Sequence, residues 1–267
     1  MDGGFLAAAP NLRVVLYGAG SIRRVAPPAF WERGLRITSA YAANAVPVSE
    51  YALAAILFSL KRGWHFAFSA QRENALPRQG QVPGVYGSTV GLVTLVMVGR
   101  LVRERLRPFD LRVVAYDPFV TPEEAHVLGV DLVSLEDLFA SSDVVSLHVL
   151  LPETEGMILG SHLASMKRKA TLINTSRGAV VREAEMVEVL GERPDLCAVL
   201  EVTPPEPPEP DSRLFDLLNV VLTPHIAGSL GNECRRMGRL VVDELRRYVA
   251  GEPLKHEITR ERAALMA

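Results

Sequence analysis

The chain has 267 residues, of which 48% are hydrophobic and 22% are charged, and its formal net charge is −2. This composition is typical of a soluble globular protein with one large or two modest α/β domains. A net charge this close to zero gives no reason to expect nucleic acid or an anionic membrane as a partner.

Strand-like apolar runs alternate with helical runs along the chain. Two short strands are expected at 12–17 and 35–40, around a helical turn, and a long helix is expected at 48–66. Six further strands are expected at 89–96, 111–116, 144–150, 170–174, 196–200 and 219–223. Helices are expected at 99–109, 134–141, 161–168, 182–192 and 230–251. This alternation predicts an α/β fold with a doubly wound parallel sheet.

Cysteine usage and the start of the chain favour a reducing compartment. Cys197 and Cys234 have no close cysteine neighbour, which argues against a disulfide framework or a zinc site. The first residues lack a basic region followed by a long apolar run, so no signal peptide is expected. The longest apolar stretch, 91–98, is far too short to span a bilayer. We therefore expect a cytoplasmic protein with no bound metal and no membrane partner.

A dinucleotide-binding unit is predicted where strand 89–96 leads into helix 99–109 and then into strand 111–116. Asp117 follows the second strand, where an acidic residue accepts hydrogen bonds from the adenosine ribose hydroxyls. The alternative for Asp117 is an ordinary turn residue before a proline.

The phosphate-binding turn of this unit departs from its usual sequence, G-x-G-x-x-G. Thr94 and Val96 occupy the first two glycine positions, and only the third glycine, Gly99, is present. The first glycine permits a tight turn, and the second lets pyrophosphate approach the backbone. A β-branched residue adds bulk there and resists a positive φ. The sequence therefore predicts an intact scaffold with a damaged phosphate cradle.

Five segments together resemble the NAD-dependent D-2-hydroxyacid dehydrogenases, the family that includes phosphoglycerate dehydrogenase. They stand in the family order and spacing, and they are NAVPVSEYALAAILFSLKR (44–62), GSTVGLV (87–93), VVAYDPF (113–119), INTSRGAVV (173–181) and LTPHIAGS (222–229). The resemblance implies a Rossmann-like NAD-binding domain and hydride transfer between nicotinamide and a small D-2-hydroxy or 2-oxo acid.

The resemblance also implies three catalytic residues. Arg177 corresponds to the arginine that binds the substrate carboxylate, and a guanidinium suits this role because it donates two parallel hydrogen bonds. His225 corresponds to the proton-transferring histidine, and Glu206 to the glutamate that pairs with it. Considered singly, each has an ordinary alternative: a surface arginine, a solvated loop glutamate and a structural histidine. His148 is expected to be structural.

Further binding residues are implied in the same way. The cofactor-binding set is Thr94, Val96, Met97, Val98, Gly99, Asp117, Thr175, Glu201 and Gly228. The substrate-binding set is Gly18, Ala19, Gly20 and Asn44, together with Arg177.

Four features depart from the family. The first two glycines of the cofactor turn are replaced. Glu201 stands where family members carry an aspartate near the nicotinamide amide. The segment HVLLPET (148–154) is one residue shorter than usual and lacks a proline after the histidine position. The chain also begins late in the family's substrate domain, which is expected to be N-terminally truncated.

These observations predict a Rossmann-like domain at 46–228 and a partial substrate domain formed by 1–45 and 229–267. The expected cofactor is NAD rather than NADP, because Asp117 would repel a 2′-phosphate. A homodimer through the helix at 48–66 is expected from the family. The leading function is oxidoreduction of a 2-hydroxy acid, and the alternative is a catalytically silent relative that binds a metabolite or a protein. The sequence does not identify the hydroxy acid.

Overall fold

The computed structural model describes residues 1–267 except 24, 81, 150–152 and 265–267. The centre of segment 148–154 therefore lies outside the described residues. The chain divides into two compact units. Unit 1 comprises Met1–Pro47, Leu150–Glu153 and Gly228–Ala267, and unit 2 comprises Val48–Val149 and Thr154–Ala227.

Unit 2 is built on a seven-stranded parallel sheet with the strand order β5-β4-β3-β6-β7-β8-β9. The strands are β3 (Thr89–Val93), β4 (Arg112–Tyr116), β5 (Asp131–Leu132), β6 (Val144–Leu147), β7 (Thr171–Asn174), β8 (Cys197–Leu200) and β9 (Val220–Leu222). The chain runs outward from β3 to β5 and then returns to the other side of β3 at β6. This order confirms the predicted doubly wound parallel sheet.

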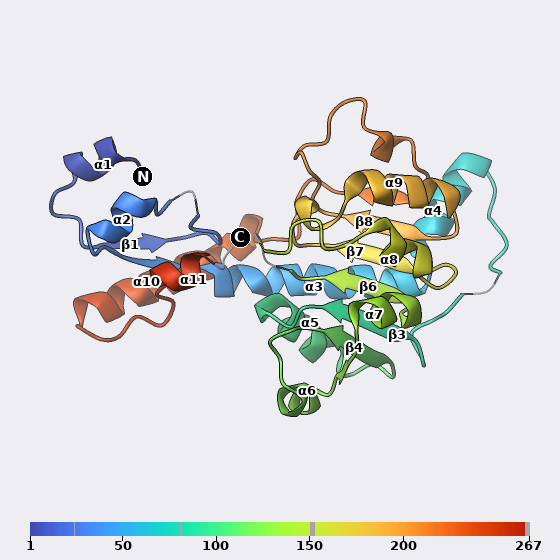
Figure 1. Cartoon of the computed structure of the whole chain (residues 1–267), viewed down its shortest axis with the longest axis horizontal. Coiled ribbons are helices and arrows are strands. Elements are labelled where there is room, and N and C mark those ends of the chain that lie inside the picture. The colour runs from blue at the N-terminus through green and yellow to red at the C-terminus, as the bar shows by residue number, and fades with distance from the viewer. Residues whose placement is uncertain (24, 81, 150–152, 265–267) are drawn as a thin grey trace. The chain divides into compact units, whose positions relative to one another are not determined.

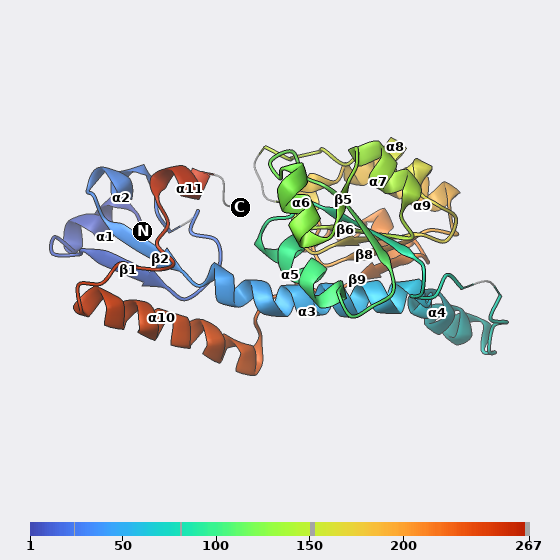
Figure 2. The ribbon, with the colours of Figure 1, turned by 90° about the horizontal axis from the view of Figure 1, so that it is seen from below.

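Helices cover both faces of this sheet (Figures 1 and 2). The main core joins β3 and its neighbours to α3 (Tyr41–Leu60), α5 (Met97–Leu106) and α6 (Pro122–Leu128). The opposite face carries α7 (Leu135–Ser141), which is followed by α8 (Gly160–Ser165) and α9 (Glu183–Glu192). Short 3-10 turns occur at Gly178–Val180 and Arg213–Phe215.

Unit 1 has a two-stranded parallel sheet of β1 (Val14–Tyr17) and β2 (Arg36–Ser39). Its helices are α1 (Gly3–Ala8), α2 (Pro28–Glu32), α10 (Cys234–Val249) and α11 (Arg260–Ala264), with a 3-10 turn at Gly231–Glu233. Its small core gathers both ends of the chain and contains Leu6, Ile22, Phe30, Leu35, Ile37 and Ile258.

The predicted helix at 48–66 is wrong in its bounds. Helix α3 begins at Tyr41 and carries Pro47 inside it, and a separate helix, α4 (Gly63–Glu73), follows. The break falls at Arg62, whose φ of 54° is left-handed and cannot continue a helix. Proline is unfavourable inside a helix because it lacks a backbone N–H. The sequence therefore predicted a helix that begins after Pro47.

Helix α3, with 20 residues, is also longer than 91–98, which was expected to be the longest apolar stretch. By length and mean hydropathy (1.4) it could cross a membrane, but 56% of its apolar window is buried in the protein. Ala52, Ala55 and Ile56 pack in the core of unit 2. Burial against the sheet therefore accounts for the apolar sequence.

Helix α6 and strand β5 were missed by the sequence analysis. Thr121 caps α6 by accepting the Glu124 N–H, and Glu124 accepts the Thr121 N–H in return. The T-P-E-E sequence is a capping-box signal that could have located this helix.

Gly91, in β3, lets α7 pack closely on the centre of the sheet. An added Cβ would lie 2.5 Å from Ser142 Oγ and 2.6 Å from Leu138 Cδ2. We therefore predict that Gly91→Ala lowers the free energy of unfolding by about 1–3 kcal/mol through overpacking. Gly191→Ala in α9, where a Cβ meets nothing within 4 Å, should instead stabilise by about 0.5–1 kcal/mol. Urea denaturation of the two variants tests this, and equal effects would contradict the packing argument.

Candidate functional site

The carboxyl ends of the strands in unit 2 form one edge of its sheet, because all the strands are parallel. The loops after β3, β4, β7, β8 and β9 carry residues singled out from the sequence. The order reverses between β3 and β6, and ligands of open α/β sheets bind at such a switch point. This edge is the candidate site.

The loop after β7 is braced by a residue that the sequence analysis did not single out. Asn174, the last residue of β7, is buried and donates from Nδ2 to the Arg177 carbonyl at 3.0 Å. Its Oδ1 accepts the Ser176 N–H at 3.0 Å and the Ser176 hydroxyl at 2.8 Å. An asparagine that bonds the backbone two residues later forms an Asx turn, so the Asn-Thr-Ser sequence carried this signal. Asn174 therefore fixes the backbone that presents Arg177.

Gly178 brings this loop against the loop after β8. An added Cβ would collide with the Thr203 backbone and with Pro204. Thr203 also donates its hydroxyl to the Pro205 carbonyl at 2.6 Å, which shapes the start of the proline-rich loop. Close packing at Gly178 thus sets the loop that carries Arg177 beside the loop that carries Glu206.

Glu206 and His225 form a hydrogen-bonded pair. Glu206 Oε1 lies 2.5 Å from His225 Nδ1, and their side chains are 41% and 48% exposed. If Nδ1 carries the proton that Glu206 accepts, Nε2 remains to exchange a proton with a ligand. The exposure leaves that exchange open to solvent or to a bound molecule.

Arg177 lies within electrostatic reach of this pair. Burial lowers the pKa of the Arg177 guanidinium, and the charge of Glu206 raises it. Arg177 also donates to the Ser176 carbonyl at 2.6 Å. The three residues predicted as catalytic therefore lie in one unit, where Glu206 hydrogen-bonds His225 and its charge acts on Arg177.

Two other predicted residues follow β7 and β8. Thr175 donates its hydroxyl to the Leu147 carbonyl at 3.5 Å. Glu201 is 2% exposed, and its carboxylate accepts the Thr223 hydroxyl and the Ala227 N–H. Its oxygens therefore bond to the loop that contains His225, while its predicted place near nicotinamide stays a prediction.

The substrate-binding residues predicted in unit 1 lie close to one another. The Ala19 and Gly20 carbonyls both accept the Ser39 hydroxyl, the former at 2.9 Å. Asn44 Oδ1 accepts the Ser229 N–H at 2.8 Å. A Cβ on Gly228 would lie 3.2 Å from the same Asn44 oxygen, and a Cβ on Gly20 would lie 3.9 Å from Asn44 Nδ2. A Cβ on Gly18 would face Val241 of α10 at 3.7 Å.

The turn after β3 keeps a glycine-like backbone without its first glycine. Thr94 has a φ of 68°, in the left-handed region that was expected to resist a β-branched residue. Its N–H donates to the Tyr116 carbonyl at 2.8 Å, and its hydroxyl donates to the His148 carbonyl at 2.9 Å. These bonds tie the turn to β4 and to the loop after β6, and they offset the unfavourable backbone conformation.

Asp117 supports the same turn from the end of β4. One carboxylate oxygen accepts the Leu95 N–H at 2.7 Å, and the other accepts the Phe119 N–H at 2.8 Å. Each oxygen has a second lone pair, so a ribose hydroxyl can still bond there. Asp117 can therefore act as a turn residue and still bond a ribose hydroxyl.

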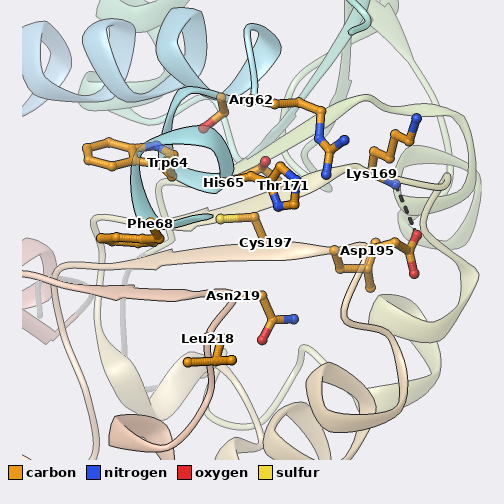
Figure 3. A pocket seen from close by; sticks show the side chains of 12 residues that line it. Arg62, Trp64, His65, Phe68, Lys169, Thr171, Asp195, Cys197, Leu218 and Asn219 are labelled. Carbon is orange, nitrogen blue, oxygen red and sulfur yellow. Dashed lines mark hydrogen bonds between the residues drawn. The ribbon is translucent and has the colours of Figure 1, made fainter. Parts of the chain in front are cut away.

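A cavity lies at the opposite, amino-terminal edge of the sheet (Figure 3). Thr171 and Cys197 begin β7 and β8 there, and the Lys169 N–H donates to Asp195 at 3.1 Å. Burial raises the pKa of the Cys197 thiol to about 12, so the thiol stays protonated and unreactive. This cavity is separate from the candidate site.

Metal chemistry has no obvious location in the described part of the chain. Within the residues that the structure describes, no group of three or more His, Cys, Asp or Glu side chains could hold a metal ion. His148 is buried, and burial lowers its pKa to about 3, so it is neutral, in line with a structural residue.

Comparison with known proteins identifies the family. A family model described as the NAD binding domain of the D-isomer specific 2-hydroxyacid dehydrogenases matches residues 54–227. The chain belongs to this family. The match confirms the resemblance seen in the sequence, and NAD is the cofactor of the matched domain.

Individual relatives agree with this assignment. A D-3-phosphoglycerate dehydrogenase of Mycobacterium bovis is 36% identical over 254 residues, which cover 94% of this chain and 48% of the relative. A glyoxylate reductase of Korarchaeum cryptofilum is 33% identical over 264 residues, which cover 94% of this chain and 77% of the relative. The chain spans about half the length of the phosphoglycerate dehydrogenases that it matches.

Solved structures share the fold. The crystal structure of the TT0316 protein from Thermus thermophilus superposes with a TM-score of 0.80 at 31% identity, covering 95% of this chain and 81% of that one. A 2-hydroxyacid dehydrogenase from Lactobacillus delbrueckii in its NAD-complexed form has a TM-score of 0.81 at 22% identity, covering 96% of this chain and 81% of that one.

Several described residues of the NAD binding domain keep features that are expected of a dinucleotide site. No side chain caps the N-terminus of α5, where backbone N–H groups and the helix dipole favour a phosphate. Gly99 keeps α5 close to β3, because a Cβ there would collide with the Thr94 carbonyl. Asp117 is the residue that is predicted to bond the adenosine ribose. Val96, the half-buried N-cap residue of α5, is a branched residue at the position where the second glycine of the motif would let the pyrophosphate approach.

We predict that Val96→Gly strengthens NADH binding by roughly tenfold to a hundredfold. Restored access recovers charge-assisted hydrogen bonds that are worth about 1.5–3 kcal/mol each, and 1.4 kcal/mol is a factor of ten. Thr94→Gly is the matched control and should gain nothing, because Thr94 already adopts the required φ and its hydroxyl holds the turn. Calorimetric titration with NADH measures both variants. Equal gains, or none from Val96→Gly, would refute this account of the turn.

Proposed function

We propose that the protein is an NAD-dependent oxidoreductase that interconverts a small D-2-hydroxy acid and its 2-oxo acid. The observation that supports this most directly is the hydrogen-bonded pair of Glu206 and His225, with Arg177 beside it. Family membership supports the same reaction type. The chain spans only part of its longer relatives, so the activity rests on these residues and on experiment.

Each residue of the trio has a distinct role in this proposal. Arg177 binds the substrate carboxylate through two parallel hydrogen bonds. His225 donates a proton from Nε2 to the alkoxide oxygen during reduction and accepts it back during oxidation. Glu206 holds the imidazole through Nδ1 and keeps Nε2 directed toward the substrate. NAD, when bound, supplies or accepts the hydride.

The substrate class is a small carboxylic acid with oxygen on the adjacent carbon. The named relatives act on 3-phosphoglycerate and glyoxylate, and these two acids are the first to test. We further propose that the protein works in the reducing cytoplasm, consistent with two free cysteines. The segments 1–45 and 229–267 serve as its substrate domain, and 46–228 as its cofactor domain.

The assay follows NADH absorbance, with NADH and a panel of 2-oxo acids that includes glyoxylate, and with NAD⁺ and 3-phosphoglycerate. We predict turnover with at least one of these acids. His225→Gln should lower kcat by about a hundredfold to ten-thousandfold, the usual contribution of general acid–base catalysis. Arg177→Gln should mainly raise the KM for the 2-oxo acid. Exposed Arg213→Gln and Glu209→Gln are matched controls and should leave both constants unchanged. NADH binding without turnover of any substrate would favour the catalytically silent alternative.

We also propose an isologous homodimer that uses the exposed side of α3. Ala54 and Phe58 are exposed on this helix, one turn apart. We predict a dimer by light scattering at tens of micromolar. Ala54→Arg, which adds a long charged side chain to this face, should yield monomer, whereas Gln71→Arg on α4 should not. A monomeric parent protein would contradict the proposal.

A further inference from the structure

The loop that carries His225 is anchored on both sides of the histidine. It follows β9, and Pro224, His225 and Ile226 are exposed. His225 has a φ of 52°, a left-handed conformation that residues other than glycine adopt rarely. The His225 N–H donates to the Thr223 carbonyl at 3.0 Å. A strained and exposed tip of this kind needs fixed attachment points before and after it.

Glu201 supplies both attachment points. Its Oε1 accepts the Thr223 hydroxyl, two residues before His225, and its Oε2 accepts the Ala227 N–H, two residues after it. Glu201 is buried, and its own N–H is bonded to the Asn174 carbonyl at 3.1 Å. The carboxylate therefore links the loop to the rigid ends of β7 and β8.

Tyr51 of α3 extends this network. Its hydroxyl lies 3.2 Å from Thr223 Oγ1. Burial raises the pKa of Tyr51 to about 12, so the phenol keeps its proton and can donate it to Thr223. Thr223 then donates its own hydroxyl proton to Glu201. Each hydroxyl in the series from Tyr51 through Thr223 thus donates to the next residue, and the series ends at the carboxylate of Glu201.

The longer side chain of glutamate suits this bridging position. An aspartate would hold its carboxylate about 1.5 Å closer to the backbone, the length of one carbon–carbon bond. The departure from aspartate at position 201 thus gives the carboxylate the reach to bond both Thr223 and Ala227.

We propose that Glu201 is a positioning residue that holds His225 in its left-handed conformation by bonding the loop at Thr223 and Ala227. This inference rests on the proposed function, in which His225 transfers the proton. It assigns Glu201 to the acid–base side of the site rather than to the nicotinamide side.

Two variants test the bonds that Glu201 makes to the loop, one by a change at Glu201 and one by a change at Thr223. Glu201→Gln removes one acceptor oxygen, and Thr223→Val removes the hydroxyl that donates to the other oxygen. Both should lower kcat for the 2-oxo acid by about tenfold to a hundredfold, because a misplacement of 1 Å costs on the order of a hundredfold. The Kd for NADH should stay unchanged. Thr223→Ser, which keeps the hydroxyl, should restore kcat, and exposed Glu209→Gln should behave as the parent does.

A readout independent of activity separates this inference from the proposed function. The imidazole NMR signals of His225 are assigned by their loss in His225→Asn. They should shift and broaden in Glu201→Gln and in Thr223→Val, but not in Thr223→Ser or Glu209→Gln. Circular dichroism checks that each variant is folded, and Thr223→Val, with its small change of volume, keeps the test available if Glu201→Gln does not fold.

Three results would overturn the inference. Parental His225 signals in both variants would show that Glu201 does not hold the loop. Weaker NADH binding with unchanged His225 signals would place Glu201 on the nicotinamide side. Failure of Thr223→Ser to restore kcat would exclude the hydroxyl bond as the cause. If the parent turns over no 2-oxo acid, the proposed function fails, and the NMR comparison alone decides the role of Glu201.

Discussion

The parallel direction of all strands in unit 2 is the constraint on which the candidate site depends. It sends every loop that follows a strand to the same edge of the sheet. Residues as distant in sequence as Asp117, Arg177 and His225 therefore gather at that edge without a dedicated contact between them. Local packing then sets the finer geometry. Gly178 lets two loops touch, and Asn174 fixes the backbone of one of them.

Sequence patterns predicted this framework well, because buried parallel strands are short β-branched runs separated by helices. The strand at 89–96 was extended too far because apolar character continues through Val96, whereas the backbone turns at Thr94. The boundary of α3 was misplaced because Pro47 is a strong local signal, and packing of the helix against the core of unit 2 outweighs it. Helix α6 was missed although its capping box was present in the sequence.

The side-chain networks of the site were beyond prediction for a different reason. The pairing of Glu206 with His225 could be expected from the family, since both residues belong to its signature segments. The bonds from Glu201 to Thr223 and Ala227 could not, because they join two loops whose spacing no local pattern specifies. Such contacts depend together on the length of the side chain that carries the carboxylate, on the loop conformation and on burial. These are fixed only in the folded chain.

Thr94 and Glu201 show how the site accommodates departures from its family. In each position the replacement is polar, and its side chain bonds to a neighbouring loop: Thr94 to the His148 carbonyl, and Glu201 to the loop after β9. A polar group buried at a loop must find a partner, and in doing so it fixes the loop. Val96 has no such option, because its side chain can only occupy space at the start of α5. The polar departures therefore hold the loops of the site in place, while Val96 only adds bulk, and we expect cofactor affinity to depend on position 96 far more than on position 94.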